Sequence, residues 1–204
     1  GLAMRLDSTY AFPWNMTLGA IKDSTIVEKV GKRIGEHAKR LGVHINFAPV
    51  VDINTNPKNP IIGNRSFGED RENVAKMGVA FTEGMESAGV LSSGKHFPGH
   101  GDTATDSHHS LPIIDFPRER LDSLELYPYK KVIEAGLSSV MVAHLEVPAL
   151  EIKKEVPSSL SEQVITGILK EEMGFKGLIF TDALNMKGAA DRGKNGDVEL
   201  EAFL

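Results

Sequence analysis

The sequence contains no cysteine, only one tryptophan and no run of basic residues. The absence of cysteine excludes disulfide bonds and thiol catalysis, and it leaves the compartment open between cytoplasm and periplasm. A formal net charge of -5 gives no electrostatic reason to expect a nucleic acid or an anionic membrane as partner. The longest apolar runs are far shorter than the roughly 20 residues of a membrane span, and the residues after Gly1 lack the pattern of a signal peptide.

The composition that remains is that of an ordinary globular chain. Of its 204 residues, 41% are hydrophobic and 25% are charged, which is enough to form a buried core. No internal repeat or low-complexity linker marks a boundary. We therefore expect residues 1–204 to form a single domain.

Helical and strand-like patterns alternate along the chain. Apolar residues at helical spacing are followed each time by a short apolar run, and this succession occurs four times. The predicted helices are 23–42, 74–89, one around Pro128 and 161–174, and the predicted strands are 44–53, 90–94, 138–145 and 177–182. Such alternation is typical of parallel β/α units in an α/β protein.

Two architectures fit these units, a doubly wound open sheet and a (β/α)8 barrel. Neither the dinucleotide-binding nor the Walker glycine motif is present, which weakens the case for a doubly wound open sheet. Polar residues follow all four strands, at Asp52, Lys95-His96, His144 and Asp182, as barrel-mouth loops require. Because a full barrel has eight strands, we predict a portion of a (β/α)8 TIM-type barrel that lacks its first and last strands. Missing barrel segments or another chain would then cover the open sheet edges.

The segment from Lys95 to His108 carries the densest set of reactive side chains. Pro98 and the glycines beside it exclude a regular helix, so we predict a bent loop at the end of a strand. A polar surface loop rich in histidine is the simplest alternative. A metal site is less favoured, because His96 and His100 would share a face only on a helix. We expect neither a metal nor another cofactor.

The same segment resembles a known family. The sequence Lys-His-Phe-Pro-Gly-His-Gly from Lys95, a four-residue gap and Asp-Ser-His ending at His108 is similar to the signature of bacterial β-N-acetylglucosaminidases of glycoside hydrolase family 3. Segments 1–5, 46–52, 64–68 and 179–186 agree in the same order, so the resemblance spans essentially the whole chain. It implies a barrel fold and retaining, exo-acting release of terminal β-linked N-acetylglucosamine, with peptidoglycan (muropeptide) fragments as the substrates of this branch.

Retaining glycoside hydrolysis requires a carboxylate nucleophile and an acid that later acts as base. Asp182 ends an apolar strand and matches the family's catalytic Asp, although many members carry a second acid where Ala183 stands. An N-cap of a following helix is the structural alternative for Asp182. The resemblance implies that His108, oriented by Asp106, is the acid/base, and that His109 is a neighbour outside the motif.

The resemblance also implies the substrate-binding residues Lys95, His96, Arg65 and Arg5. The family's sugar-binding Asp would precede Gly1, so we expect these 204 residues to be inactive by themselves. Three further motif residues are expected in loops and pocket walls, namely Phe67, His100 and Met186.

Several alternatives stay open at this stage. Asp52 and His144 could support the residues that contact substrate, could line a subsite, or could be buried structural residues. The reaction could instead be that of a β-glucosidase or a glycoside phosphorylase of the same family. A third possibility is an inactive carbohydrate-binding or scaffold fragment.

Overall fold

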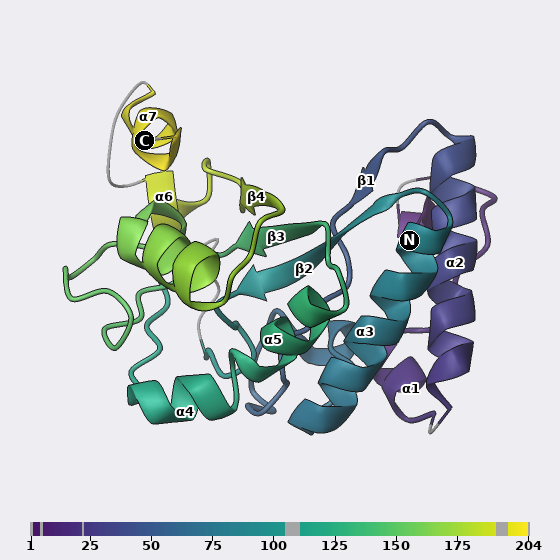
Figure 1. The fold of residues 1–204 in the computed structure, drawn as a ribbon, viewed down its shortest axis with the longest axis horizontal. Helices are drawn as coiled ribbons and strands as arrows, with labels where there is room; N and C mark the ends of the chain where they lie inside the picture. The colour runs from purple at the N-terminus through teal and green to yellow at the C-terminus, as the bar shows by residue number, and fades with distance from the viewer. Residues whose placement is uncertain (1, 5, 22, 105–110, 191–195, 204) are drawn as a thin grey trace.

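The computed structural model describes residues 2–4, 6–21, 23–104, 111–190 and 196–203. Its centre is a four-stranded parallel sheet with the order β1-β2-β3-β4. The strands are β1 (Ile45–Asn46), β2 (Leu91–Phe97), β3 (Ser139–Val142) and β4 (Leu178–Thr181). Each lies within or beside a segment predicted as strand, so the predicted succession of four parallel units is confirmed (Figure 1).

The first strand is much shorter than the predicted 44–53. Pro49 has no N–H group, so a regular ladder cannot continue through it. The chain nevertheless stays bonded to β2, since Ser93 N donates to Ala48 O at 2.8 Å and Val51 N to Lys95 O at 2.9 Å. The irregular stretch therefore still delivers Asp52 to the carboxyl end of the sheet.

The helices lie before, between and after the strands along the chain. They are α1 (Asn15–Gly19), α2 (Ser24–Arg40), α3 (Arg71–Ser87), α4 (Arg118–Ser123), α5 (Tyr127–Glu134), the π-helix η4 (Gln163–Glu172), α6 (Lys187–Ala190) and α7 (Asp197–Phe203), with 3-10 turns at Leu2–Met4, Gly63–Arg65 and Ser158–Leu160. The Asp23 carboxylate accepts from Thr25 N, and Ser161 Oγ accepts from Val164 N at 3.1 Å. Asp23 and Ser161 thus cap the starts of α2 and η4.

The single helix expected around Pro128 is instead two helices, α4 and α5. Pro128 stands in the first turn of α5. In a continuous helix, the proline ring would clash with the carbonyl of Leu124 and leave it unbonded. The chain consequently leaves helical geometry at Leu124, whose φ and ψ are -123° and -76°.

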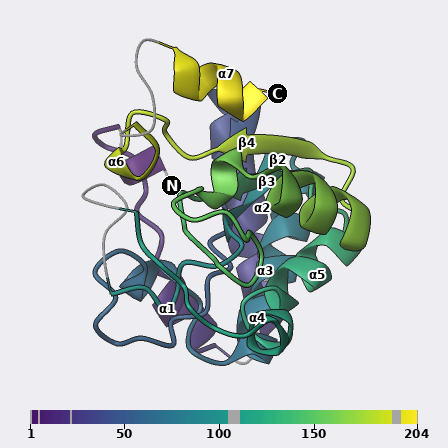
Figure 2. The same ribbon diagram turned by 90° about the vertical axis from the view of Figure 1, so that its left-hand side faces the viewer.

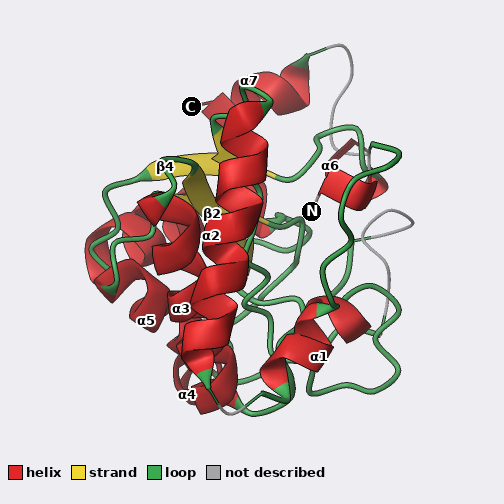
Figure 3. Cartoon of the chain, turned by 90° about the vertical axis from the view of Figure 1, so that its right-hand side faces the viewer, coloured by secondary structure: helices red, strands yellow, loops and turns green. Residues whose placement is uncertain are grey.

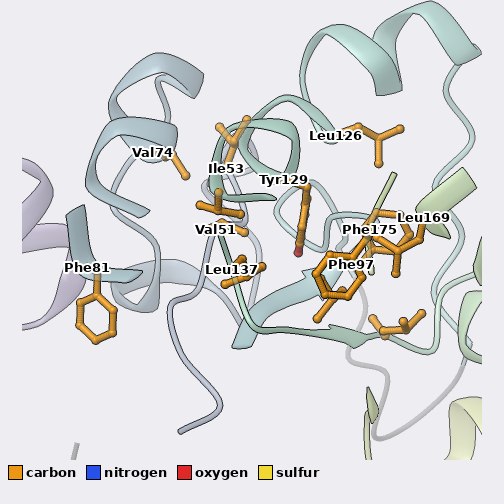
Figure 4. Close-up of a cluster of buried hydrophobic side chains, with 14 of the residues drawn as sticks. Val51, Ile53, Val74, Phe81, Phe97, Leu126, Tyr129, Leu137, Leu169 and Phe175 are labelled. Atoms are coloured by element: carbon orange, nitrogen blue, oxygen red, sulfur yellow. The ribbon is translucent and has the colours of Figure 1, made fainter. Parts of the chain in front are cut away.

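Helices α2 and α3 pack side by side on the outside of the sheet (Figures 1 and 3). A Cβ atom on Gly84 would lie 2.0 Å from the carbonyl oxygen of Glu28, so only glycine allows this approach. Beneath the helices, Val51, Phe97 and Tyr129 belong to one buried cluster (Figure 4). Over the described residues, no helix has the length and apolar character needed to cross a membrane.

The sheet is strongly curled. Phe47 follows β1 and Phe180 lies in β4, at opposite ends of the strand order, yet their ring centroids are only 5.2 Å apart. Curling of this kind brings the two outer strands toward each other, as in a portion of a barrel. The outer sides of β1 and β4 have no strand partner among the described residues. Figure 2 looks toward the carboxyl ends of the strands, where the long loops gather.

Candidate active site

Asp52 and His96 form the most buried part of the site. Asp52 is 1% exposed, and its carboxylate accepts hydrogen bonds from the His96 ring at 2.7 Å, from His96 N at 3.1 Å and from His100 N at 2.7 Å. Burial alone would raise the pKa of Asp52, but the bonds from His96 and His100 hold that pKa below its usual value. Asp52 therefore acts on the site indirectly, by orienting His96.

Arg65 meets the opposite edge of the same imidazole ring. Its Nη2 atom lies 3.1 Å from Nε2 of His96. A guanidinium has only donors and a carboxylate only acceptors, so His96 Nε2 accepts and Nδ1 carries the proton. Asn15 Nδ2 donates to the Arg65 carbonyl at 2.7 Å, which fixes the loop after β1. Arg65 and His96, both predicted to bind substrate, are thus brought together.

Lys95 lies beside this chain of hydrogen bonds at the end of β2. Burial lowers the pKa of Lys95 to about 8, and the charge of Arg65 acts in the same direction. The carboxylates of Asp182 and Asp52 oppose this change. The predicted binding residue Lys95 and the predicted nucleophile Asp182 are therefore electrostatic neighbours.

Asp182 follows β4 directly. Its N–H donates to Val142 O at 2.8 Å, and its Oδ1 accepts from Ala183 N at 2.8 Å. Helix α6 begins only at Lys187, so the N-cap alternative for Asp182 is wrong. Side chains two residues apart in a strand share a face, so the half-buried Asp182 is on the concave side with Phe180.

The glycines of the loop after β2 allow unusually close contacts. Gly99 has a φ of +142°, and a Cβ atom there would lie 2.9 Å from Cβ of Glu125. A Cβ atom on Gly101 would lie 1.7 Å from the carbonyl oxygen of Ile53. The loop is thereby pressed against the segment that carries Asp52, which explains why this motif requires glycine.

The three residues expected in loops and pocket walls are all buried. Phe67 is 1% exposed, His100 2% and Met186 7%. Nδ1 of His100 lies 2.6 Å from Oγ1 of Thr103, which is a contact within the loop. A cavity of about 470 Å³ has Phe67 in its lining, together with Asn54 and Asp70, but it does not include Lys95 or Asp182.

Two residues that support the loop were missed in the sequence. Asn59 Nδ2 donates to His100 O at 2.7 Å, and Arg120 Nη2 donates to Asp102 Oδ2 at 2.6 Å and to Glu125 Oε1 at 3.2 Å. Their partners are distant along the chain and no motif connects them. An asparagine within a proline-rich turn and a helical arginine are too common to have been singled out.

His144 follows β3 and is fully buried. Its ring contacts Ser159 Oγ at 2.6 Å and Ala183 O at 3.0 Å. Of the roles left open for His144, direct contact with substrate in a subsite is therefore disfavoured.

Three predicted site residues, Arg5, Asp106 and His108, lie outside the described residues, as does His109. Among the residues that the structure does describe, no three His, Asp or Glu side chains are grouped as a metal ion would require.

The described residues bring a carboxylate, an ammonium group and an arginine-histidine pair to the carboxyl ends of parallel strands. This is where barrel enzymes hold their catalytic residues, and it defines the class as a barrel-type enzyme domain. The sequence profile described as "Glycosyl hydrolase family 3 N terminal domain" matches residues 1–203, and the chain belongs to this family.

Known relatives agree with this assignment. The chain is 40% identical to "Beta-hexosaminidase A" of Pseudoalteromonas piscicida, over 95% of its own length and 34% of the relative's. It superposes on a solved glycoside hydrolase family 3 β-N-acetylglucosaminidase from Paenibacillus sp. str. FPU-7 with a TM-score of 0.94 and 44% identity, covering 97% of the chain and 38% of that protein. A solved β-glucoside phosphorylase, BglX, superposes on the chain with a TM-score of 0.88 and 31% identity, covering 92% of the chain and 35% of that protein. The chain thus spans little more than a third of each.

Proposed function

We propose that the intact protein is a retaining, exo-acting glycosidase that releases terminal β-linked N-acetylglucosamine. The observation that carries this proposal is that Asp182 and Lys95 are electrostatic neighbours at the carboxyl ends of β4 and β2, with the Arg65–His96–Asp52 chain of hydrogen bonds at the same end of the sheet. A carboxylate there can attack an anomeric carbon, while the cation and the hydrogen-bonding groups hold sugar hydroxyls.

In the proposed reaction, a carboxylate oxygen of Asp182 attacks the anomeric carbon and the bond to the leaving oxygen breaks. His108, oriented by Asp106, gives its proton to that oxygen. Water then attacks the same carbon, the bond to Asp182 breaks, and His108 takes the proton from water. The motif Asp106-Ser107-His108 supports these two roles.

The sugar is inferred from two kinds of evidence. The relative from Pseudoalteromonas piscicida is named a β-hexosaminidase, and the Paenibacillus protein is described as a β-N-acetylglucosaminidase. The Asp-Ser-His motif resembles the branch that acts on cell-wall fragments. We therefore propose muropeptides carrying a terminal N-acetylglucosamine as substrates, with Lys95, His96, Arg65 and Arg5 as substrate-binding residues.

Kinetics of the intact protein test the proposal. We expect hydrolysis of an aryl N-acetyl-β-glucosaminide and of a disaccharide muropeptide, with little turnover of the aryl β-glucoside. A 2-fluoro mechanism-based sugar should label the peptide that contains Asp182. Asp182→Asn should abolish both turnover and labelling, whereas Asp115→Asn makes the same chemical change at an exposed site and should do neither. Label on Asp102 or Asp106 would contradict the proposed nucleophile.

Phosphorolysis is a second candidate reaction. The similarity to a β-glucoside phosphorylase favours it, and a neutral histidine base would repel incoming phosphate less than a carboxylate would. Turnover that rises with phosphate and yields a sugar 1-phosphate would support phosphorolysis. If the intact protein binds these sugars without turnover or labelling, it is a carbohydrate-binding protein instead.

A further inference from the structure

The proposed mechanism leaves one buried histidine without a role. His144, directly after β3, and Ser159, in the turn Ser158–Leu160, are both 0% exposed. A buried histidine is retained at little cost only when both ring nitrogens have partners. The partners of His144 therefore indicate what it does.

Those partners define a directed chain of hydrogen bonds. Nε2 of His144 lies 3.0 Å from the carbonyl oxygen of Ala183. A carbonyl only accepts, so Nε2 carries the proton. In the neutral ring Nδ1 is then an acceptor, and the Ser159 hydroxyl, 2.6 Å away, donates to it. The Ala183 carbonyl thus fixes the tautomer, and Ser159 satisfies Nδ1 and holds the ring in place.

Ala183 is the residue next to the proposed nucleophile. Its carbonyl accepts from His144 and also from Met186 N at 2.9 Å, which occupies both lone pairs of the oxygen. On the other side, Asp182 N donates to Val142 O at 2.8 Å. Two residues near the end of β3, Val142 and His144, thus hold the backbone on either side of the Asp182 carboxylate.

This support matters because β4 is the last strand in the described sheet. It is bonded to β3 on one side, and helix α6 does not begin until Lys187. Without the bond from His144, the Ala183 carbonyl would keep, among the described residues, only the local bond from Met186 N. A shift of about 1 Å in a reacting group can reduce the rate ~100-fold.

We propose that His144, held by Ser159, is a positioning residue that fixes the Asp182 carboxylate for attack through its hydrogen bond to the Ala183 carbonyl. This inference rests on the proposed function of Asp182. His144 exchanges no proton with the substrate. Its substitution should therefore lower the rate of the covalent steps and leave the binding of the sugar nearly unchanged.

Three variants of the intact protein test the inference. His144→Phe keeps an aromatic ring and removes the hydrogen bonds to Ala183 and Ser159. His144→Gln places an amide N–H near the position of Nε2, so it can still donate to Ala183. Ser159→Ala removes the hydroxyl that satisfies Nδ1 and holds the ring. His44→Phe is the matched control, since His44 is exposed.

With an aryl N-acetyl-β-glucosaminide, we expect kcat to fall ~100-fold in His144→Phe with little change in KM. The rate of labelling by the fluorosugar should fall in parallel. His144→Gln should recover most of the loss, Ser159→Ala should be intermediate and His44→Phe should behave as wild type. A purely structural role would not produce recovery by glutamine at equal thermal stability.

The results that would contradict the role of His144 differ from those that would contradict the proposed function. If His144→Phe folds and keeps the kcat of wild type, or if Gln is no better than Phe at equal stability, the inference is wrong. If His144→Phe does not fold, Ser159→Ala and His144→Gln decide, and wild-type kcat in Ser159→Ala overturns the inference. If the wild-type protein neither turns over nor becomes labelled, the proposed function fails and the inference falls with it.

Discussion

The Nδ1 atom of His96 lies 2.7 Å from Oδ2 of Asp52, and both side chains are almost completely buried. Three donors in all converge on the Asp52 carboxylate, namely the His96 ring and the backbone N–H groups of His96 and His100. An amide in its place would present two hydrogens of its own to these donors. The ionised form of Asp52 is therefore required for the geometry of His96.

We accordingly predict that Asp52→Asn lowers the free energy of unfolding by about 3 kcal/mol, because buried donors lose their acceptor. KM for the N-acetylglucosaminide should also rise, since His96 would be released. Chemical denaturation and steady-state kinetics measure the two effects. Asp115→Asn, at an exposed position, is the control. Equal stability of the two variants would contradict the role of Asp52.

The pKa of Lys95 predicts a specific dependence of stability on pH. Burial lowers this pKa from its usual 10.5 to about 8 in the folded protein. Between these values the unfolded chain binds more protons than the folded chain, so the contribution of Lys95 to stability rises with pH. Below pH 8 both states are protonated and this contribution is constant. Lys95→Met should remove the rise in the free energy of unfolding between pH 8 and 10, which is measured by chemical denaturation at each pH.

The same titration should affect binding of the sugar. Above pH 8, Lys95 loses its charge and becomes a weaker partner for sugar hydroxyls, so KM of wild type should rise there. Lys170→Met alters an exposed lysine of η4 and is the control for both measurements. A pH profile of stability that is the same in Lys95→Met and Lys170→Met would rule out the assignment.

Gly101 is predicted to tolerate no side chain. A Cβ atom there would lie 1.7 Å from a backbone oxygen of Ile53, and backbone cannot rotate away as a flexible side chain can. Gly101→Ala should lower the thermal midpoint and kcat/KM together, because the loop must move away from the segment bearing Asp52. At Gly167, the nearest atoms to an added Cβ atom belong to the flexible side chain of Gln163. Gly167→Ala should therefore leave both quantities at or above wild type, and a similar tolerance at Gly101 would show that the loop is not held closely.

If His108 is the acid, the effect of replacing it on kcat/KM should depend on the leaving group of the substrate. We expect His108→Ala to reduce kcat/KM for the muropeptide ~1000-fold, because its leaving oxygen needs a proton. An activated aryl glycoside, whose departure needs little protonation, should lose far less. His109→Ala should change neither substrate. Equal losses of His108→Ala on both substrates would refute the assignment.

The elements of the fold could be predicted because their signals are local. The helix α2 begins after the Asp23 cap and shows apolar residues at helical spacing, and the strands appear as short apolar runs. Where local signals conflicted, the prediction was wrong in detail, as at Pro128, whose ring divides one expected helix into two. The position of Asp182 at a strand end was likewise readable from the apolar run before it.

The support of the site could not be predicted in the same way. His96 and Asp52 are 44 residues apart, and His144 and Ala183 are 39 residues apart. Each pair meets only because two strands are neighbours in the sheet, which no local pattern specifies. Asp52 and His144 could be singled out as polar residues at strand ends, but their partners and protonation states follow from the folded geometry alone.

The contact between Phe47 and Phe180 has a consequence for the register of the strands. Hydrogen bonds link β1 to β2, β2 to β3 and β3 to β4, and the two rings then connect β4 back to the end of β1. The four segments therefore form a closed circuit of contacts. A slip of β4 by one residue would turn Phe180 away from Phe47 and Asp182 away from the concave side at the same time. Removal of either ring would open this circuit, and the alignment of β4 with β1 would then depend on the strand pairing through β2 and β3.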